Sequence, residues 1–288
     1  MKPRVLVTGG GGMLARDLKP RLEAAGFEVV APGKTQLDIA QAGHVSGILA
    51  TLKPQAVFNC AAFTKVDLCE TDPLARAVND EGVGILADAC RDFGSRLVHV
   101  STDFVFDGEK REPYREDDEA NPVSAYGKTK RGGEVRALSI PGSLVVRSSW
   151  LFGSHGPNFV DAILKQVESG GRELRVVADQ VGRPTATSDL ADALVELYRA
   201  GAEGILHFAN AGEVTWNEFA REILRLSGLR DVVVAPISSG ELKRPARRPA
   251  YSVLSTEKYE GLIGKNPRDF REPLAEYLER RARNRARP

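Results

Sequence analysis

Short apolar runs alternate with longer amphipathic segments through the first half of the chain. Each run is rich in valine, leucine or alanine, which is typical of strands that are buried on both faces of a parallel sheet. Because helices that cross between parallel strands cover both faces, this alternation predicts a doubly wound parallel α/β sheet. The predicted strands are Val5–Val7, Val29–Ala31, Ala56–Phe58, Leu97–Val100 and Leu144–Val146, and the predicted helices are Met13–Ala25, Ala42–Leu52, Pro73–Phe93 and Ser124–Leu138.

After Trp150 the pattern becomes less regular, and prolines interrupt the stretch 236–249. We therefore predict a main domain over residues 1–150 and a smaller lobe over residues 151–288. Some elements around 172–208 are expected to return to the main sheet. The predicted helices of this half are Asn158–Glu168, Ser188–Arg199, Trp216–Leu226 and one from Pro273 onward, and its predicted strands are Leu174–Val177, Ile205–Phe208 and Val232–Val234.

The composition restricts the class of protein. The chain has 288 residues, of which 42% are hydrophobic, enough for a large core, and its formal net charge of +1 gives no field for binding nucleic acid. The arginine-rich run 280–287 is expected to be the exposed end of the last helix. The first residues lead directly into a predicted strand and no apolar segment reaches membrane-span length, so we expect a soluble, cytoplasmic protein without a leader or a membrane partner. The cysteines lack metal-type spacing, and no metal is expected.

A glycine-rich turn lies between the first predicted strand and the first predicted helix. In this position Gly9 permits a tight turn, and Gly12 lets the backbone approach a pyrophosphate at the positive end of the helix. Met13 and Leu14 follow at the helix start and belong to the same candidate site. The first domain is therefore predicted to bind a dinucleotide.

The end of the second predicted strand bears on which dinucleotide is bound. Sites for NAD tend to hold the ribose 2′-hydroxyl with Asp or Glu at this place. The residues from Val30 to Lys34 include no carboxylate, so a 2′-phosphate would meet no repulsion, although Lys34 could also be an ordinary surface lysine. Asp38, followed by Ile39, could receive the adenine amino group or cap a helix. We expect NADPH as the cofactor, with NADH also accepted.

Tyr126 and Lys130 are four residues apart and share one face of their predicted helix. A phenol with a pKa of about 10 transfers protons slowly at neutral pH, and a neighbouring ammonium would lower that pKa. Lys130 could also donate to the ribose hydroxyls of a nicotinamide cofactor. Thr102 follows a buried strand, at the end where open α/β sheets place ligands, and could orient a carbonyl oxygen. These three residues are typical of hydride transfer between a nicotinamide and an alcohol carbon.

Several further motifs resemble those of the dTDP-4-dehydrorhamnose reductase family, whose members are extended short-chain reductases with a Rossmann-type sheet. The resemblance spans nearly the whole chain. It implies reduction of the 4-keto group of dTDP-4-dehydro-L-rhamnose to dTDP-L-rhamnose. The motifs are Asn59-Cys60-Ala61-Ala62-Phe63-Thr64-Lys65-Val66-Asp67, Ser101-Thr102-Asp103-Phe104-Val105-Phe106-Asp107-Gly108, Tyr126-Gly127-Lys128-Thr129-Lys130, Arg147-Ser148-Ser149-Trp150, Asn158-Phe159, Asp179-Gln180-Val181-Gly182-Arg183-Pro184-Thr185 and Arg248-Pro249.

The resemblance implies a role for each matching residue of the site. The catalytic residues would be Thr102, Tyr126 and Lys130, and the nicotinamide side of the cofactor would be lined by Ala61, Ala62, Phe63 and Thr64. The nucleotide-sugar substrate would contact Thr102, Asp103, Trp150, Asn158 and Arg248, the last through its pyrophosphate. Structural roles stay open for three of them: Trp150 could be core, Asn158 could cap its helix, and Arg248 could be a surface residue.

Some members of the family dimerise around a magnesium ion held by glutamates. The corresponding residue of the first predicted helix is Asp17, whose side chain is shorter, so the metal site is not expected here. Whether the chain forms a homodimer stays open.

Three other functions compete with this reading. A sugar-nucleotide 4,6-dehydratase needs a base after its Thr-Asp pair, but Asp103 is followed by Phe104. A non-catalytic nucleotide-binding regulatory subunit could keep the fold, but such a protein would not need Thr102, Tyr126 and Lys130 together. A reductase of another 4-keto-6-deoxysugar nucleotide remains an alternative.

The missing carboxylate after the second strand generates a prediction about the cofactor. NADPH should be accepted at least as well as NADH, and Lys34→Ala should lower kcat/KM for NADPH more than for NADH, because only NADPH carries the 2′-phosphate. The measurement is kcat/KM with each cofactor for both proteins. A strong preference for NADH that the substitution leaves unchanged would contradict this prediction.

Overall fold

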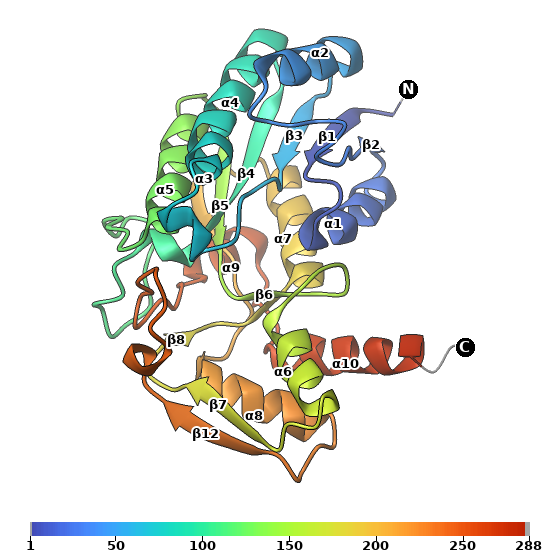
Figure 1. Ribbon diagram of the computed structural model, residues 1–288. Helices are drawn as coiled ribbons and strands as arrows, with labels where there is room; N and C mark the ends of the chain where they lie inside the picture. The colour runs from blue at the N-terminus through green and yellow to red at the C-terminus, as the bar shows by residue number, and fades with distance from the viewer. Residues whose placement is uncertain (1, 286–288) are drawn as a thin grey trace.

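A six-stranded parallel sheet forms the centre of the larger part of the molecule (Figure 1). The computed structural model describes residues 2–285. From β1 the sheet extends to β2 on one side and through β3, β4 and β5 to β10 on the other. The predicted doubly wound sheet is confirmed. The strands are β2 Glu28–Val30, β1 Arg4–Thr8, β3 Ala56–Asn59, β4 Arg96–Thr102, β5 Leu144–Ser148 and β10 Gly204–His207.

Successive residues of each strand face opposite sides of the sheet, and helices cover both sides. Val5 and Val7 of β1 belong to a core that includes residues of α1 and α7, whereas Leu6 belongs to a core that includes residues of α2, α4 and α5. Burial on both sides explains why the strands read as continuous apolar runs. The helices are α1 Met13–Ala24 and α7 Thr187–Arg199 on one face, and α2 Ala42–Leu52, α4 Gly82–Phe93 and α5 Ala125–Leu138 on the other (Figure 1).

The predicted helix Pro73–Phe93 is interrupted near its start. A short α3 (Leu74–Arg76) is followed by a π-helical turn over Ala77–Glu81, which leads directly into α4. The Oδ1 atom of Asp72 accepts a hydrogen bond from the Leu74 N–H at 2.9 Å and so caps the first turn. Single π turns of this kind often lie at functional sites, and this one contributes to the site described below.

The smaller lobe lies below the sheet in Figure 1. Its strands β7 (Glu173–Val177) and β12 (Val233–Ile237) form a parallel pair, and α8 (Trp216–Leu226) packs against both of them. Two further helices, α6 (Phe159–Glu168) and α10 (Arg271–Arg285), pack on α8. Aromatic and aliphatic residues of these elements form a second hydrophobic core.

Strand β12 is longer than predicted because it runs through Pro236. The Val233 N–H donates to the Arg172 oxygen, and the Ile237 oxygen accepts from the Ala178 N–H, so these two positions face β7. Because facing alternates along a strand, the nitrogen of Pro236 points away from β7, where its missing N–H costs no ladder bond. The remaining short elements, which the sequence pattern does not predict, are β6 Leu151–Phe152, β8 Val181–Gly182, β9 Thr185–Ala186, β11 Val214–Thr215, α9 Glu257–Ile263 and the 3₁₀ turns Leu68–Glu70, Asp103–Val105 and Ser239–Leu242.

Only part of the segment around residues 172–208 joins the large sheet. Helix α7 packs on α1 and strand β10 pairs with β5, whereas β7 pairs with β12 in the smaller lobe. The large sheet is thus completed by residues that follow Trp150. The exact division of the chain at residue 150 stays a prediction.

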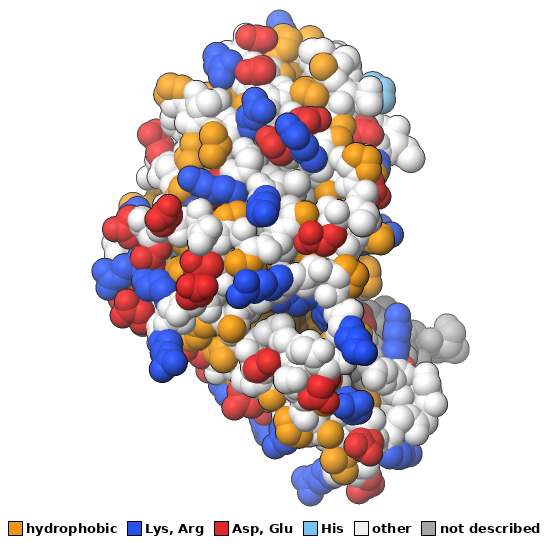
Figure 2. All heavy atoms as spheres, turned by 60° about the vertical axis from the view of Figure 1, so that its left-hand side comes forward, with side chains coloured by type: hydrophobic (Ala, Val, Ile, Leu, Met, Phe, Trp, Pro, Cys, Tyr) orange, Lys and Arg blue, Asp and Glu red, His pale blue; other side chains and the backbone are white. Residues whose placement is uncertain are grey.

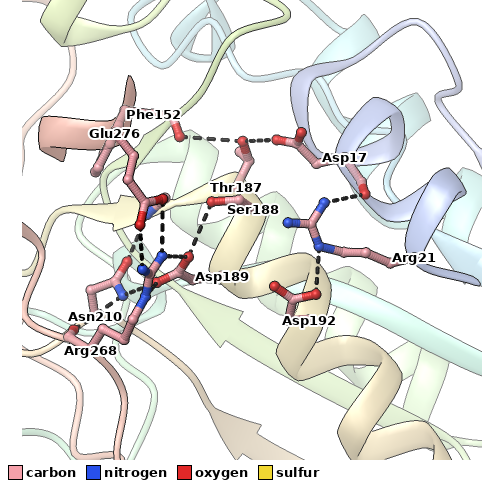
Figure 3. A network of polar contacts seen from close by, with 11 residues as sticks. Asp17, Arg21, Phe152, Thr187, Ser188, Asp189, Asp192, Asn210, Arg268 and Glu276 are labelled. Carbon is pink, nitrogen blue, oxygen red and sulfur yellow. Dashed lines mark hydrogen bonds and ion pairs between the residues drawn. The ribbon is translucent and has the colours of Figure 1, made fainter. Parts of the chain in front are cut away.

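Polar contacts at the start of α7 join it to both ends of the chain (Figure 3). The Thr187 hydroxyl donates to the Oδ2 atom of Asp17 on α1 at 2.5 Å. On the other side, Arg268 donates to the Oδ1 atom of Asp189 at 2.7 Å, and the Asn210 amide donates to Oδ2 of the same carboxylate at 2.7 Å. Helix α7 therefore contacts both α1 of the first half of the chain and the segment around Arg268 of the second half.

The surface carries charges of both signs. On the face shown in Figure 2, Lys and Arg side chains are interspersed with Asp and Glu, in keeping with the net charge of +1. Helix α10 carries the arginine-rich run as far as Arg285, and residues 286 and 287 of that run lie outside the described part of the chain. Among residues 2–285, no helix combines the length and the hydropathy that a membrane span requires.

A buried ion pair links α5 to β5. The Nε and Nη2 atoms of Arg147 each donate to one oxygen of Glu134 at 2.8 Å, and the two side chains are 1% and 0% exposed. The Arg147 guanidinium also lies over the Phe106 ring, 4.9 Å from its centre. Burial alone would raise the pKa of Glu134, but the hydrogen bonds and charge of Arg147 bring that pKa below its ordinary value.

This pair generates a prediction about stability. Glu134→Gln should lower the free energy of unfolding by about 3–5 kcal/mol, because it leaves the buried Arg147 charge without its partner. A matched control is Glu279→Gln, which breaks a pair with Arg283 whose side chains are 67% and 71% exposed. The control should change stability by less than about 1 kcal/mol. Urea denaturation of the three proteins measures both values, and equal small losses would contradict the prediction.

Candidate active site

The crevice of the sheet lies where the chain leaves β1 and β3. These strands are neighbours, but β1 leads to α1 on one face and β3 leads to elements on the other face. Ligands of open α/β sheets bind at such a switch point, beyond the carboxyl ends of the strands. The glycine turn and the segment Cys60–Thr64 are therefore brought together here.

The glycine turn is shaped by two close contacts. Gly9 has a φ of +67°, and its oxygen accepts from the Gly12 N–H at 2.8 Å. Gly10 passes so close to the end of β2 that a Cβ there would lie 2.1 Å from the oxygen of Ala31. Any side chain at position 10 would therefore clash with the residue after β2, so this position requires glycine. The local sequence pattern does not predict this contact.

A cavity of about 340 Å³ opens beside this turn. It is lined by eight of the predicted cofactor-binding residues. The rest of its lining consists of Gly11, Leu37, Cys60 and Val78. Lys34 is exposed at this cavity, while the Oδ1 atom of Asp38 accepts from the Ala40 N–H at 3.1 Å. The eight predicted residues are Gly9, Gly12, Lys34, Asp38, Ile39, Ala61, Ala62 and Phe63.

Five predicted cofactor-binding residues do not line this cavity. Two of them, Tyr126 and Lys130, belong to the candidate catalytic group on α5, and the other three are Met13, Leu14 and Thr64. Met13 begins α1, and Leu14, which is 7% exposed, belongs to the core beneath the sheet. Thr64 follows the lining segment Ala61–Phe63 by one residue. A role for these three residues in cofactor binding stays a prediction.

The segment before α5 and the glycine after Tyr126 place the catalytic candidates. The Ser124 hydroxyl accepts from the Gly127 N–H at 3.2 Å and caps the helix. A Cβ at Gly127 would lie 2.1 Å from the oxygen of Phe104, so glycine lets α5 approach the segment that follows Thr102. The Tyr126 ring then meets the Phe104 ring edge-on, with centres 5.5 Å apart.

The pKa of Tyr126 differs from the expectation. Burial raises it above its ordinary value, while a hydrogen bond with the Thr102 hydroxyl lowers it to a smaller extent. The Nζ atom of Lys130 donates to the oxygen of Val100 at 2.7 Å. Burial also lowers the pKa of Lys130 itself to about 8, against the opposing influence of Glu134 and Cys60.

A buried amide that the sequence pattern does not predict holds the cavity wall. The Asn79 Oδ1 atom accepts from the Phe63 N–H at 2.8 Å, and its Nδ2 atom donates to the Phe63 oxygen at 3.0 Å. Asn79 lies in the π-helical turn and is 1% exposed. The turn therefore directs a polar side chain at the backbone of a cofactor-binding candidate. A polar residue within an apolar helical face was the only sequence signal for it.

A second cavity, of about 250 Å³, lies between the large sheet and the smaller lobe. Trp150 has a φ of +47° and stacks on Trp216, with ring centres 3.5 Å apart and planes 5° apart. The predicted candidates Trp150 and Arg248 both line this cavity. Its other lining residues are Phe104, Phe159, Ile163, Gln166, Arg175, Val176, Val177, Gln180, Trp216, Leu242, Arg244, Pro249 and Ser252.

Asp103 connects the end of β4 to this second cavity. It is 1% exposed, and its carboxylate accepts from the Ser252 hydroxyl at 2.5 Å and from the Thr102 hydroxyl at 3.0 Å. Burial raises the pKa of Asp103 to about 6, although these hydrogen bonds oppose the rise. The contact with Ser252 ties the segment after Thr102 to the wall of the second cavity.

Two predicted substrate contacts are occupied by protein groups. The Nη1 and Nη2 atoms of Arg248 each donate to one Asp67 oxygen at 3.0 Å. The Asn158 Oδ1 atom accepts from the Asp161 N–H at 3.1 Å, and its Nδ2 atom donates to the oxygens of Gly153 and Gly156. The capping role left open for Asn158 is thus present. Substrate roles for both residues stay predictions.

Asp17 and the histidines give no sign of a metal centre. Asp17 accepts from Thr187, as described above, and its Oδ1 atom lies 4.0 Å from the Nε2 atom of His155. Within residues 2–285, no group of three or more His, Cys, Asp or Glu side chains has the geometry to hold a metal ion.

Comparison with known proteins places these features in a family. The profile described as the RmlD substrate binding domain matches residues 2–283. A dTDP-4-dehydrorhamnose reductase of Streptomyces griseus is 44% identical over 96% of this chain and 93% of its own. The chain belongs to the dTDP-4-dehydrorhamnose reductase family.

Two other members show the breadth of the family. A probable dTDP-4,6-dihydroxy-2-methyloxan-3-one 4-ketoreductase of Streptomyces antibioticus is 43% identical over 95% of this chain and 94% of its own. A dTDP-4-dehydrorhamnose reductase of Bacillus anthracis, solved in complex with NADP, is 33% identical, and its fold superposes with a TM-score of 0.93 over 97% of this chain and 100% of that one. The similarity thus covers both the large sheet and the smaller lobe.

Proposed function

We propose that the protein reduces the 4-keto group of dTDP-4-dehydro-L-rhamnose to give dTDP-L-rhamnose, with NADPH as the preferred reductant and NADH accepted. One observation carries the proposal: the Thr102, Tyr126 and Lys130 group lies between the two cavities. The charge of Lys130 influences the pKa of the Cys60 thiol of the first cavity, and the Tyr126 ring contacts Phe104 of the second.

The first cavity fits a dinucleotide. Its wall includes Gly9, Gly11 and Gly12 of the glycine turn and the segment Ala61–Phe63, and at Gly9 a Cβ would lie 2.9 Å from the backbone of Ala61. The exposed Lys34 and the absence of a carboxylate after β2 favour a 2′-phosphate, and the NADP of the Bacillus anthracis relative supports the same choice. When bound, the cofactor supplies the hydride that is transferred to C4 of the sugar.

The residues around the crevice supply the proton. The Tyr126 hydroxyl gives its proton to the O4 atom as the hydride arrives, and the Thr102 hydroxyl orients that oxygen. Because burial raises the pKa of Tyr126, the phenol stays protonated at neutral pH, and this is the form that a reduction consumes. Lys130 holds the ribose of the cofactor and lies at the base of the site, where it is 2% exposed.

The second cavity fits the sugar nucleotide. The Trp150–Trp216 stack offers a flat apolar surface to the deoxysugar or the base, and arginines line the same cavity. Burial and the charge of Arg248 lower the pKa of Arg244, so an anion placed between the two guanidiniums would be favourable. We assign the substrate pyrophosphate to this pair, with Asp67 holding Arg248 in place.

Two alternatives remain. The Streptomyces antibioticus relative is named for a different 4-keto sugar nucleotide, so the chain could act on such a substrate with the same chemistry. The second is a non-catalytic nucleotide-binding regulatory subunit, but the placement of Thr102, Tyr126 and Lys130 between two cavities disfavours it. An assay of NADPH oxidation against several 4-keto-sugar nucleotides separates these functions.

The proton-donor assignment predicts the effect of removing one hydroxyl. Tyr126→Phe should lower kcat by about 10²–10⁴-fold with little change in the Kd for NADPH, because the hydroxyl acts mainly in the transition state. Lys130→Met should lower kcat and also raise that Kd, because it loses the ribose contact. Single-turnover rates and cofactor titrations measure both quantities. Near-normal turnover in Tyr126→Phe would show that another group donates the proton.

The Arg248–Asp67 contact predicts a graded effect on substrate binding. Arg248→Ala should raise KM more than it lowers kcat, and Arg248→Lys should restore only part of the loss, because lysine lacks the two-pronged donor geometry. Asp67→Asn keeps the guanidinium but loosens its anchor, so it should raise KM to a smaller extent. These values come from steady-state kinetics with the sugar nucleotide. Unchanged KM in Arg248→Ala would remove Arg248 from the substrate site.

A further inference from the structure

Two hydroxyls share one buried carboxylate beside the catalytic candidates. The Oδ2 atom of Asp103 accepts from the Ser252 hydroxyl at 2.5 Å, and its Oδ1 atom accepts from the Thr102 hydroxyl at 3.0 Å. All three side chains are buried. Ser252 lines the second cavity and lies 149 positions after Asp103, so this contact joins the wall of that cavity to the end of β4.

Backbone contacts on two sides hold Ser252 in place. Its N–H donates to the Val181 oxygen at 2.9 Å, and the Val181 N–H donates to the Ala250 oxygen at 2.8 Å. On the other side, a Cβ at Gly108 would lie 2.5 Å from the Ala250 nitrogen, so the loop after β4 packs directly against this segment. The Ser252 hydroxyl is therefore held at Asp103 by the packing of its own backbone.

Thr102 has only one hydroxyl hydrogen to donate. A hydroxyl donates one hydrogen and accepts up to two. Thr102 accepts from the Phe104 N–H at 3.2 Å and also forms a hydrogen bond with Tyr126. Because an ionised carboxylate can only accept, the Thr102 hydrogen points to Asp103, and the Tyr126 hydroxyl is the donor to Thr102. To orient the O4 atom of the substrate by donation, Thr102 must first turn this hydrogen away from Asp103.

The bond from Ser252 stabilises the Asp103 charge more than the bond from Thr102 does. It is the shorter of the two, and among the hydrogen bonds that oppose the effect of burial on the pKa of Asp103 it has the largest influence. A buried charge that loses its donors is costly. While Ser252 donates, the carboxylate keeps its stronger donor, so the release of the Thr102 hydrogen costs less.

The other ionisable groups around Asp103 do not replace these hydrogen bonds. Tyr126 on α5 is uncharged at neutral pH, because burial raises its pKa. The Arg248 guanidinium of the second cavity is paired with both oxygens of Asp67. Asp107, further along the loop after β4, accepts from a tyrosine hydroxyl at 2.7 Å. The hydrogen bonds to Asp103 are therefore what offsets the burial of its charge.

We propose that Ser252 is a positioning residue that satisfies the Asp103 carboxylate from the wall of the second cavity and thereby frees the Thr102 hydrogen to turn to the O4 atom of the substrate. The inference rests on the proposed function, because it concerns how Thr102 orients that oxygen. Ser252 acts through Asp103 and Thr102 and does not itself donate to the reacting oxygen.

The first test removes the Ser252 hydroxyl and follows the pH profile. In Ser252→Ala the carboxylate depends on Thr102, so kcat should fall about ten-fold at alkaline pH, by more than KM rises. The loss should shrink as the pH falls through the pKa of Asp103, because a neutral carboxyl holds the Thr102 hydrogen less strongly. Steady-state kinetics with the sugar nucleotide, from mildly acidic to alkaline pH, measure both quantities. A loss of equal size at every pH would overturn the proposal.

The second test asks whether Ser252 acts through the charge of Asp103. Asp103→Asn removes that charge and has a cost of its own, because Asp103 is also a candidate substrate contact. In this background Ser252→Ala should lower kcat by less than about two-fold, because no carboxylate competes for the Thr102 hydrogen. A further ten-fold loss, about as large as in the wild-type background, would mean that Ser252 acts by another route and would overturn the proposal.

Two further variants control for packing. Ser252→Thr keeps the hydroxyl, and the cavity that Ser252 lines can take the added methyl group, so this variant should restore most of the wild-type kcat. Ser255→Ala removes a buried hydroxyl from the same segment, whose oxygen accepts from the Glu257 N–H at 3.4 Å, and it should leave the profile unmoved. Equal losses in Ser252→Ala and Ser255→Ala would overturn the role of the Ser252 hydroxyl.

A third measurement needs no substrate. In ¹³C spectra of the full protein, labelled at the aspartate carboxyl carbons, the Asp103 signal is assigned by its loss in Asp103→Asn. The pKa of Asp103, about 6 in the wild type, should rise by about one to two units in Ser252→Ala and stay unchanged in Ser255→Ala. An unchanged pKa in Ser252→Ala would overturn the proposal. If the wild type lacked reductase activity, the proposed function would fail, while this titration would still decide whether Ser252 stabilises the Asp103 charge.

Discussion

The parallel pairing of β1 with β3 is the constraint on which the rest of the site depends. Thr8 lies opposite Asn59 in this register, and their side chains form a hydrogen bond of 2.6 Å. Beyond these residues the chain turns to opposite faces of the sheet, so the crevice opens directly above the pair. A shift of one residue would reverse the faces of the whole strand, break this contact and move the glycine turn away from Ala61.

Close backbone approach fixes the two walls of the reaction site. At Gly10 the glycine turn meets the residue after β2, and at Gly127 helix α5 meets the segment after Thr102. Both approaches are shorter than a side chain permits, and each sets the position of groups that are distant in sequence. The hydroxyls of Thr102 and Tyr126 can therefore converge without flexible loops, which is how preorganised sites limit the cost of orientation.

Local patterns in the sequence predict the strands, the helices and the glycine turn. Contacts between residues that are distant in the sequence determine the other features of the site. The five strands of the first half and five of the eight cofactor candidates at one cavity follow from apolar runs and the residues at the strand ends. The other three, Ala61, Ala62 and Phe63, follow only from the family resemblance. The pairing of Arg248 with Asp67 joins residues 181 positions apart, and no local pattern reports it. The same holds for Trp216, which stacks on Trp150 from the start of α8. The pKa of Tyr126 differs from the expectation because helical spacing places Lys130 nearby but does not show that the phenol is buried, and burial raises its pKa.

The late position of β10 has a consequence for how the chain folds during its synthesis. Its strand pairs with β5 only after the intervening residues, including α6, β7 and α7, have left the ribosome. Until then β5 is an open edge of the sheet, and α1 lacks the partner that covers its face. The first half of the chain therefore stays incomplete during synthesis until β10, which begins more than fifty residues after the end of β5, has been made. Until then the exposed edge of β5 can pair with a wrong strand.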